Sequence, residues 1–190
     1  MAGTGKLIVI SGPSGAGKGT IVEQLLKSGK YELSISCTTR APRGQEKEGV
    51  NYFFKSREEF ERMIGEQKFL EYADVFGCYY GTPKDYVLGK LDEGKNVILE
   101  IDVQGALQVK KNYPDAVMIF ILPPSEEVLL ARLRGRGTET EEQISKRFGK
   151  ARAEMELADK YDYSVVNDDL MTAVAEVREM IKKANGGFNR

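Results

Sequence analysis

Residues 12–18 read Gly12-Pro13-Ser14-Gly15-Ala16-Gly17-Lys18, directly after the apolar run Leu7–Ile10 and directly before the helix-like stretch Thr20–Leu26. Glycines let successive backbone N–H groups turn toward the phosphates of a nucleotide, and the helix that follows presents the positive end of its dipole. The flexible ammonium of Lys18 can travel with a phosphoryl group as it is transferred. Glycine at a strand-to-helix turn can serve the turn alone, but the spacing, the lysine and both flanking elements favour a phosphate-binding loop. The sequence therefore predicts a nucleoside triphosphate site over residues 12–20.

One position of this loop departs from the usual pattern. Gly19 follows Lys18, where many such loops place serine or threonine. The hydroxyl nearest to a bound metal ion is therefore expected to be that of Thr20 or Ser14. Because Mg²⁺ dehydrates reluctantly, we expect it to be coordinated partly through water.

Length and composition limit the class of protein. A chain of 190 residues with 41% apolar and 30% charged residues can bury one sizeable core, so one domain with inserted subdomains is expected. The net charge of −1 argues against a general nucleic-acid or membrane surface. Cys37 and Cys78 match no metal-binding spacing, and no leader or long apolar run is seen. A cytoplasmic location is the expectation.

The sequence contains no histidine. Ser-His-Asp and Cys-His catalysis are therefore excluded, and the commonest transition-metal ligand is missing. Any chemistry must be carried out by backbone amides, lysine, arginine and carboxylates.

Four buried-strand patterns recur along the chain, each followed by a helical pattern. They cover Leu7–Ile10, Asn96–Ile101, Ala116–Leu122 and Tyr163–Val166. Alternation of strand and helix predicts an α/β fold with a parallel sheet and helices on both of its faces.

The stretch between the first two of these strands has a different residue pattern. Short, aromatic-rich strands and one charged helix are expected there, within 32–37, 52–54 and 69–73 and from about 56 to 65. We interpret residues 34–82, approximately, as an inserted, partly antiparallel subdomain. Thr82 and Pro83 then fit the N-cap and first residue of the helix that returns the chain to the core.

A mobile lid is expected at about 132–147, because a stretch rich in glycine and arginine interrupts two helices there. The core would then comprise 1–33, 83–131 and 148–190.

Arg40 and Arg43 lie on either side of Pro42, close to the hydroxyls of Ser36 and Thr39. Two guanidinium groups held this way form a good receptor for a phosphate dianion, since each planar fork can donate paired hydrogen bonds. A solvated basic loop is the alternative reading of the same residues.

Seven segments, taken in order, resemble the motifs of guanylate kinases, and together they span nearly the whole chain. They are residues 12–18, Ser36-Cys37-Thr38-Thr39-Arg40-Ala41-Pro42-Arg43, Gly49-Val50-Asn51-Tyr52-Phe53, Tyr79-Tyr80-Gly81-Thr82, Glu100-Ile101-Asp102-Val103-Gln104-Gly105, Gly135-Arg136-Gly137-Thr138-Glu139-Thr140 and Val166-Asn167-Asp168-Asp169-Leu170. Many families share the phosphate loop, whereas the Thr-Thr-Arg-x-Pro-Arg and Tyr-Tyr-Gly segments are specific to this one.

The resemblance implies a P-loop nucleoside monophosphate kinase fold, with a five-stranded parallel core sheet, an inserted GMP-binding subdomain and a mobile lid. It implies transfer of a phosphoryl group from MgATP to GMP or dGMP, with no nucleic-acid or membrane partner. The oligomeric state stays open. Two other readings are a scaffold module that binds phosphopeptides, which typically lacks a working phosphate loop, and an adenylate kinase, which would not need an acidic base pocket.

The resemblance also implies a GMP site. The residues that would grip its phosphate are Ser36, Arg40, Arg43, Tyr52 and Tyr80, and those facing its base are Glu71, Thr82 and Asp102. Guanine presents N1–H and the 2-amino group as adjacent donors that a carboxylate can accept as a pair, whereas adenine does not. A buried carboxylate would therefore reject adenine. Glu71 and Asp102 could instead be surface carboxylates.

Further roles follow from the same resemblance. Glu100 would assist Mg²⁺ together with Thr20, although a structural ion pair fits it as well. Lys18 and Arg40, joined by the lid residues Arg132, Arg136 and Arg147, would neutralise charge on the phosphoryl groups. Asn167 would contact the adenine of ATP. Alternatively, Asn167 forms a turn before Asp168, which would be the N-cap of the next helix.

Overall fold

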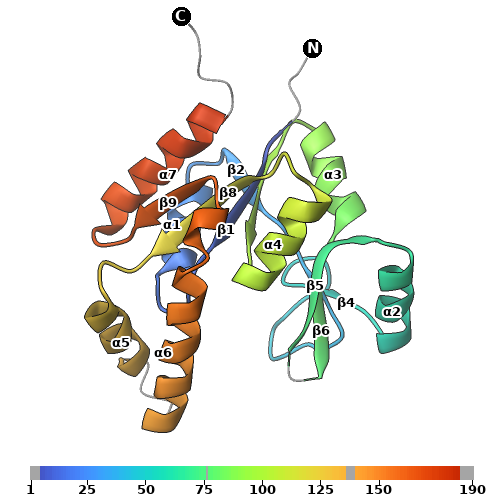
Figure 1. Cartoon of the computed structure of the whole chain (residues 1–190). Helices are drawn as coiled ribbons and strands as arrows, with labels where there is room; N and C mark the ends of the chain where they lie inside the picture. The colour runs from blue at the N-terminus through green and yellow to red at the C-terminus, as the bar shows by residue number, and fades with distance from the viewer. Residues whose placement is uncertain (1–4, 76, 136–139, 185–190) are drawn as a thin grey trace, which may run out of the picture.

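The computed structural model describes residues 5–75, 77–135 and 140–184, which form a larger and a smaller sheet with helices around them (Figure 1). The strands are β1 (Leu7–Ser11), β2 (Tyr31–Leu33), β3 (Cys37–Thr38), β4 (Phe53–Phe54), β5 (Phe69–Val75), β6 (Cys78–Pro83), β7 (Asn96–Glu100), β8 (Val117–Leu122) and β9 (Tyr163–Val166). The helices are α1 (Lys18–Leu26), α2 (Arg57–Gly65), α3 (Lys84–Asp92), α4 (Val103–Asn112), α5 (Glu126–Arg134), α6 (Glu141–Met155) and α7 (Leu170–Ala184), with a 3₁₀ turn η1 (Ala158–Lys160).

The larger sheet has the order β2-β7-β1-β8-β9, and every pairing in it is parallel. Its central strand β1 is buried on both faces, as the unbroken apolar run predicts. Ile8 and Ile10 face a core that α1 and α7 complete, whereas Leu7 and Val9 face one that α3 and α4 complete. The predicted five-stranded parallel sheet with helices on both faces is thereby confirmed.

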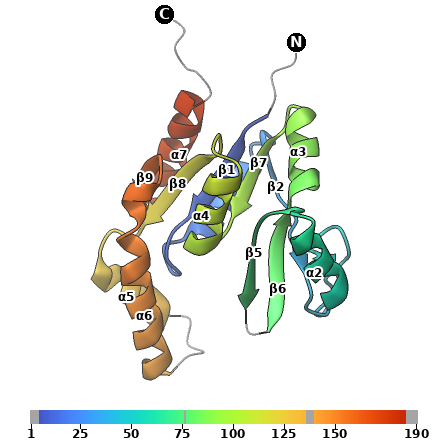
Figure 2. The same ribbon diagram turned by 45° about the vertical axis from the view of Figure 1, so that its right-hand side comes forward.

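The smaller sheet, β4-β3-β6-β5, mixes one parallel pairing with two antiparallel ones. Figure 2 separates its β5–β6 pair from the larger sheet and shows α2 beside it. Its small core centres on Phe60 of α2, whose ring stacks on Phe69 at 4.3 Å and on Tyr79 at 5.2 Å between centroids. The limits of the expected insertion, 34–82, stay a prediction.

Helix α4 joins the two sheets through polar side chains. Gln108 bonds both backbone groups of Tyr72, accepting from its N–H and donating to its carbonyl at 3.1 Å each. One turn later, Asn112 donates to the carbonyl of Leu70 at 2.8 Å. The outer edge of β5 is therefore paired with α4 rather than with another strand.

Two local expectations are wrong. The stretch 32–37 is not one strand, because Leu33 ends β2 beside β7 of the larger sheet and Cys37 begins β3 of the smaller one. Thr82 is not a helix cap either. Pro83 takes the N-cap position of α3, and the Thr82 hydroxyl donates to Glu71 within the smaller sheet.

No helix in the described ranges is long and apolar enough to cross a membrane.

Phe60→Ala should lower the free energy of unfolding by about 3–5 kcal/mol, because it removes a fully buried ring and leaves a cavity in the small core. Chemical denaturation followed by circular dichroism measures the change. Val50→Ala, at a position 64% exposed in the same part of the chain, is the matched control and should change stability by less than about 0.5 kcal/mol. Equal effects of the two substitutions would contradict this account of the small core.

Candidate functional site

The loop between β1 and α1 has a positive φ at Gly12, Gly15 and Gly17, a backbone conformation that favours glycine. Gly12 and Gly17 have φ angles of 139° and 87°. A Cβ at Gly12 would lie 2.3 Å from the carbonyl oxygen of Ile121, and one at Gly17 would lie 2.4 Å from Nδ2 of Asn167. The loop is thus fitted tightly between β8 and the residue that follows β9, at the carboxyl edge of the larger sheet.

Lys18, the first residue of α1, folds back over this loop. Its Nζ donates to the carbonyls of Gly12 and Pro13 at 2.6 and 3.0 Å. Arg147 of α6 reaches the same loop, where its Nη2 donates to Oγ of Ser14 at 2.5 Å. A lysine and an arginine from distant parts of the chain therefore meet at the mouth of the loop.

A cavity of about 860 Å³ opens above the loop. Glu100, at the end of β7, lines it opposite Lys18 and Thr20. Glu100 is exposed to the cavity, yet desolvation by the cavity walls raises the pKa of its carboxyl, and the charge of Lys18 opposes this effect. Because each wall carries ionisable groups, the cavity suits a ligand that is itself charged.

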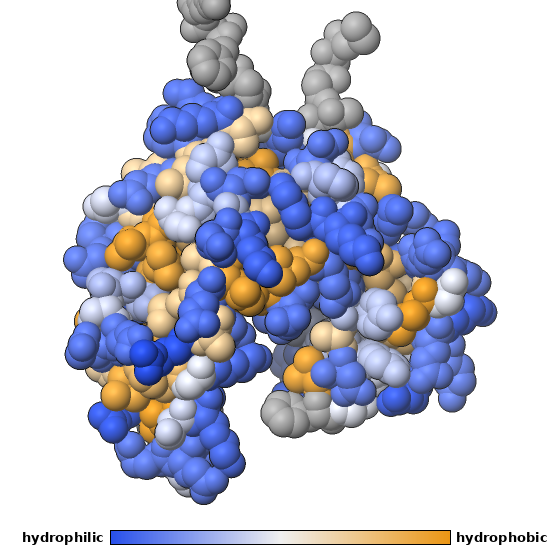
Figure 3. Space-filling model, viewed as in Figure 1, coloured by the Kyte–Doolittle hydropathy of each residue, from blue (hydrophilic) through white to orange (hydrophobic). Residues whose placement is uncertain are grey.

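A second hollow of about 170 Å³ lies beside the first. Ser36, Tyr52 and Thr82 line it, and it shares Glu100 and Ile101 with the larger cavity. In the space-filling view, the molecule is hollowed between the α5–α6 part and the β5–β6 part (Figure 3). Two ligands could therefore bind side by side with Glu100 and Ile101 at their boundary.

Arg40 lies next to Tyr52, which lines the second hollow, and next to Tyr80. Its Nε donates to Oη of Tyr80 at 3.1 Å, and its Cζ lies 5.4 Å from the ring centroid of Tyr52. The two tyrosine rings meet edge to face at 6.0 Å. Arg43 is exposed on the same loop. Ser36 lies one residue before β3 and lines the hollow. These five residues are thus placed around one small region.

Glu71 and Thr82 form a buried polar pair on β5 and β6. The Thr82 hydroxyl donates to Oε1 of Glu71 at 2.6 Å, and both residues are less than a tenth exposed. Burial raises the pKa of the Glu71 carboxyl; the Thr82 hydrogen bond opposes this, and the charge of Asp102 adds to it. Asp102 caps α4, where its Oδ1 accepts from the N–H of Gly105 at 2.8 Å. The two carboxylates therefore face one another across the first turn of α4.

The remaining predicted residues brace the loop. Asn167 is buried, and its side-chain Nδ2 donates to the backbone carbonyl of Ala16 at 2.8 Å. The backbone carbonyl of Asn167 accepts from Nη2 of Arg132 at 3.1 Å. The Nη1 of Arg132 is buried and has no hydrogen-bond partner among the described residues. Asp169, not Asp168, caps α7, since its Oδ1 accepts from the N–H of Thr172. Arg136 lies outside the described residues.

Sequence reasoning missed several residues at this site. Lys150 and Glu154 line the larger cavity with Arg147, and they pair with each other at 3.5 Å. Their spacing of three and four residues along α6 was the available signal, since it places all three on one helix face. Glu46, which pairs with Arg40, was given no role because the folded loop creates this contact. Gly105 belongs to the motif 100–105 but was given no role of its own, because its contact is with Glu71, which is distant in sequence.

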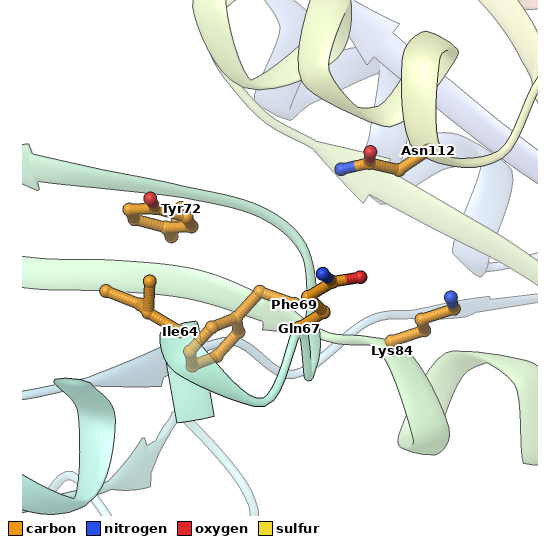
Figure 4. Close-up of a pocket in the computed structure, with 6 residues that line it drawn as sticks. All are labelled: Ile64, Gln67, Phe69, Tyr72, Lys84 and Asn112. Atoms are coloured by element: carbon orange, nitrogen blue, oxygen red, sulfur yellow. The ribbon is translucent and has the colours of Figure 1, made fainter. Parts of the chain in front are cut away.

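Another cavity, of about 280 Å³, lies at the junction of α2, β5 and α4 and is separate from both hollows (Figure 4). Lys84 is the one charged side chain among its described lining residues, which otherwise include Phe69, Tyr72 and Asn112. It holds no carboxylate to balance that charge and no glycine-rich turn. We therefore assign no chemistry to it.

The chain was compared with known proteins. The family model for guanylate kinase matches residues 4–184. The chain is 58% identical over 178 residues to a guanylate kinase of Caldanaerobacter subterraneus subsp. tengcongensis, covering 93% of this chain and 86% of that one. It is 54% identical over 181 residues to a guanylate kinase of Clostridium acetobutylicum, with 95% and 87% covered.

Solved structures agree with these sequence matches. The crystal structure of guanylate kinase from Anaplasma phagocytophilum matches with a TM-score of 0.72 and 34% identity, covering 95% of this chain and 86% of that one. A Thermus thermophilus protein, TT1252, matches with a TM-score of 0.51 at 16% identity, covering 95% and 97%, and so bears on the fold alone.

Gly105→Ala should destabilise the protein by about 1–2 kcal/mol, because a Cβ there would lie 2.9 Å from Oε2 of Glu71 and force the buried carboxylate away from Thr82. Gly89→Ala is the matched control: Gly89 lies inside α3 with nothing within 4 Å of an added Cβ, so alanine should stabilise by about 0.5–1 kcal/mol. The two substitutions should change the free energy of unfolding in opposite directions, as measured by thermal or denaturant unfolding. Stabilisation by both substitutions would show that Glu71 is not confined.

Proposed function

The chain belongs to the guanylate kinase family and catalyses ATP-dependent phosphorylation of GMP, and we propose that the two hollows meeting at Glu100 and Ile101 are its ATP and GMP sites. The shared boundary is the observation that carries this assignment, since a direct transfer requires the two substrates to lie in contact. Phosphorylation of dGMP and a cytoplasmic location belong to the same proposal.

On the ATP side, the phosphate loop would cradle the triphosphate. The loop and the first turn of α1 would present backbone N–H groups, Pro13 excepted, at a helix start whose dipole favours anions. The Lys18 ammonium would exchange its two carbonyl partners for phosphate oxygens and follow the phosphoryl group during transfer. Asn167 would hold the loop through its hydrogen bond to the carbonyl of Ala16 and would contact the adenine of ATP.

Mg²⁺ fits the residues present at this boundary. The Glu100 carboxylate and the Thr20 hydroxyl both line the cavity, and oxygen ligands are those that Mg²⁺ prefers. An ideal Cβ at Gly19 would lie 3.5 Å from Oε1 of Glu100, so the glycine leaves the carboxylate accessible. No cluster of three or more acidic, cysteine or histidine side chains suited to a metal occurs in the described ranges, so water and phosphate would complete the coordination. When bound, the ion would neutralise charge on the phosphates.

On the GMP side, Arg40 and Arg43 would hold the phosphate with Ser36, Tyr52 and Tyr80. The acceptor phosphate is already an anion near neutral pH, so no general base is required. The work of the site is to place this phosphate in line with the phosphoryl group, to neutralise charge and to exclude water. The absence of histidine is consistent with such a mechanism.

The guanine base would be read by Glu71 and Asp102, with Thr82 fixing Glu71. Burial disfavours the ionised Glu71, and the paired N–H donors of guanine would compensate this by hydrogen bonding to the charged form. Adenine cannot offer that pair, so its binding would leave a buried carboxylate without donors.

The arginines next to the phosphate loop would complete charge neutralisation. Arg147 already contacts Ser14, and Arg132 has an unpartnered, buried Nη1 close to Asn167. Both would reach the transferring phosphoryl group together with Arg136 as the lid closes over the bound substrates.

Lys18→Ala should reduce kcat by a factor of about 100 or more, the loss typical of a group that stabilises transition-state charge, and leave GMP binding largely intact. A coupled ADP-release assay measures turnover and calorimetry measures GMP affinity. Lys146→Ala serves as control, because the Lys146 side chain is 76% exposed and, among the described residues, pairs with Glu142 one turn earlier on α6. Retention of more than about a tenth of the activity by the Lys18 variant would refute the role of Lys18.

Glu71→Gln combined with Asp102→Asn should lower kcat/KM for GMP about 30- to 1000-fold, as expected from about 2–4 kcal/mol of lost charged hydrogen bonds, and lower it much less for AMP. An amide offers one acceptor and turns its NH₂ toward a guanine donor. Arg40→Ala should weaken both nucleotides alike, because phosphate carries no information about the base. An unchanged GMP-to-AMP ratio in the carboxylate variant would rule out these residues as base readers.

A further inference from the structure

The guanidinium of Arg40 is bound at all three of its nitrogens before any substrate enters. Its Nε donates to Tyr80, its Nη1 donates to the carbonyl of Ala41 at 2.7 Å, and its Nη2 donates to Glu46 at 2.9 and 3.0 Å to the two carboxylate oxygens. A guanidinium carries five N–H donors, so this arrangement fixes the plane of the group and still leaves donors for a ligand.

Glu46 holds a second part of the same loop. Its Oε2 accepts from the backbone N–H of Arg43 at 2.8 Å, while its own N–H donates to the carbonyl of Arg43 at 3.0 Å. One carboxylate thus fixes the side chain of Arg40 and the backbone of Arg43, the two arginines proposed to receive the GMP phosphate. The hydrogen bond from Arg40 is the leading cause of the lowered pKa of the Glu46 carboxyl, which therefore stays ionised near neutral pH.

We propose that Glu46 is a positioning residue for the acceptor phosphate: it holds Arg40 and the Arg43 turn in the geometry that receives GMP. This inference rests on the proposed GMP site. It assigns Glu46 a part in GMP binding without contact to the nucleotide, since Glu46 acts through the two arginines.

The opposite role, in which Glu46 competes with the phosphate for Arg40, would make it an obstacle to binding. Two features favour positioning. The hydrogen bond from the Arg43 N–H fixes the Glu46 carboxylate in place. A residue that positions Arg40 needs to be fixed in this way, whereas a residue that only competes with the phosphate does not. Glu46 is also 23% exposed, so solvent weakens its repulsion of a phosphate, while an arginine that loses its partner regains many rotamers.

Glu46→Gln tests the proposal, because the amide keeps the size of the side chain and one acceptor but removes the charge. KM for GMP should rise about tenfold, the loss expected for one charge-assisted hydrogen bond, while KM for ATP stays within about twofold. The inhibition constant of guanosine, which lacks the phosphate, should also stay within about twofold, because Glu46 acts on the phosphate receptor alone. A merely structural role would weaken GMP and guanosine together.

Glu48→Gln is the matched control. Glu48 lies in the same loop and accepts from the backbone N–H of Phe54 at 2.8 Å, but forms no ion pair within the described residues. This variant should leave KM for GMP within about twofold of the wild-type value. A rise equal to that of the Glu46 variant would refute a specific role for Glu46.

A double-mutant cycle completes the test. The melting temperature of each variant is measured as well, so that a loss of folding can be told apart from a loss of GMP binding. In an Arg40→Ala background, Glu46→Gln should change KM for GMP by a smaller factor than in the wild type, because one of its two targets is gone. An unchanged or lowered KM in the single variant, or an equal effect in both backgrounds, would overturn the proposal. Failure of the wild-type protein to phosphorylate GMP would instead refute the proposed function.

Discussion

Parallel pairing of β1 with β7 and β8 is the constraint on which both sites depend. Because Ile10 is in register with Glu100, the first turn of the phosphate loop and this carboxylate emerge at one edge of the sheet. The Ile121 carbonyl of β8 lies so close to Gly12 that no side chain fits there. The loop, its lysine and the acidic boundary are therefore placed by backbone hydrogen bonds of the most deeply buried strands, which are the least able to shift.

Helix α4 positions the smaller sheet relative to the larger one. It begins at the Asp102 cap, directly after β7, and meets β5 through Gly105, Gln108 and Asn112, spaced three and four residues apart along one face. These contacts set the distance between the Glu71 carboxylate and the carboxyl edge of the larger sheet. The pocket proposed for the base is thus built against a helix of the core, although Glu71 itself belongs to the smaller sheet.

Local sequence patterns predicted the features whose causes are local. The glycine-rich turn before Lys18 and the buried core strands depend on neighbours within a few residues, and the structure has both. The cap expected at Thr82 was wrong because its hydroxyl is used by Glu71, eleven residues earlier. The roles of Gly105 and Glu46 were not predicted for a similar reason. Gly105 acts through a contact with β5, and Glu46 acts through a turn whose shape no periodicity encodes.

Among the described residues, four cations next to the two hollows already have partners when no substrate is bound. Lys18 rests on loop carbonyls, Arg147 contacts Ser14, Lys150 pairs with Glu154, and Arg40 pairs with Glu46. At the proposed sites, substrate binding would therefore be an exchange of partners, and its strength would be a difference between two sets of charged hydrogen bonds. Such an arrangement keeps a chain of net charge −1 from exposing an unbalanced basic surface. It also favours ligands with several phosphate oxygens over single small anions, because only they can replace several of these partners at once.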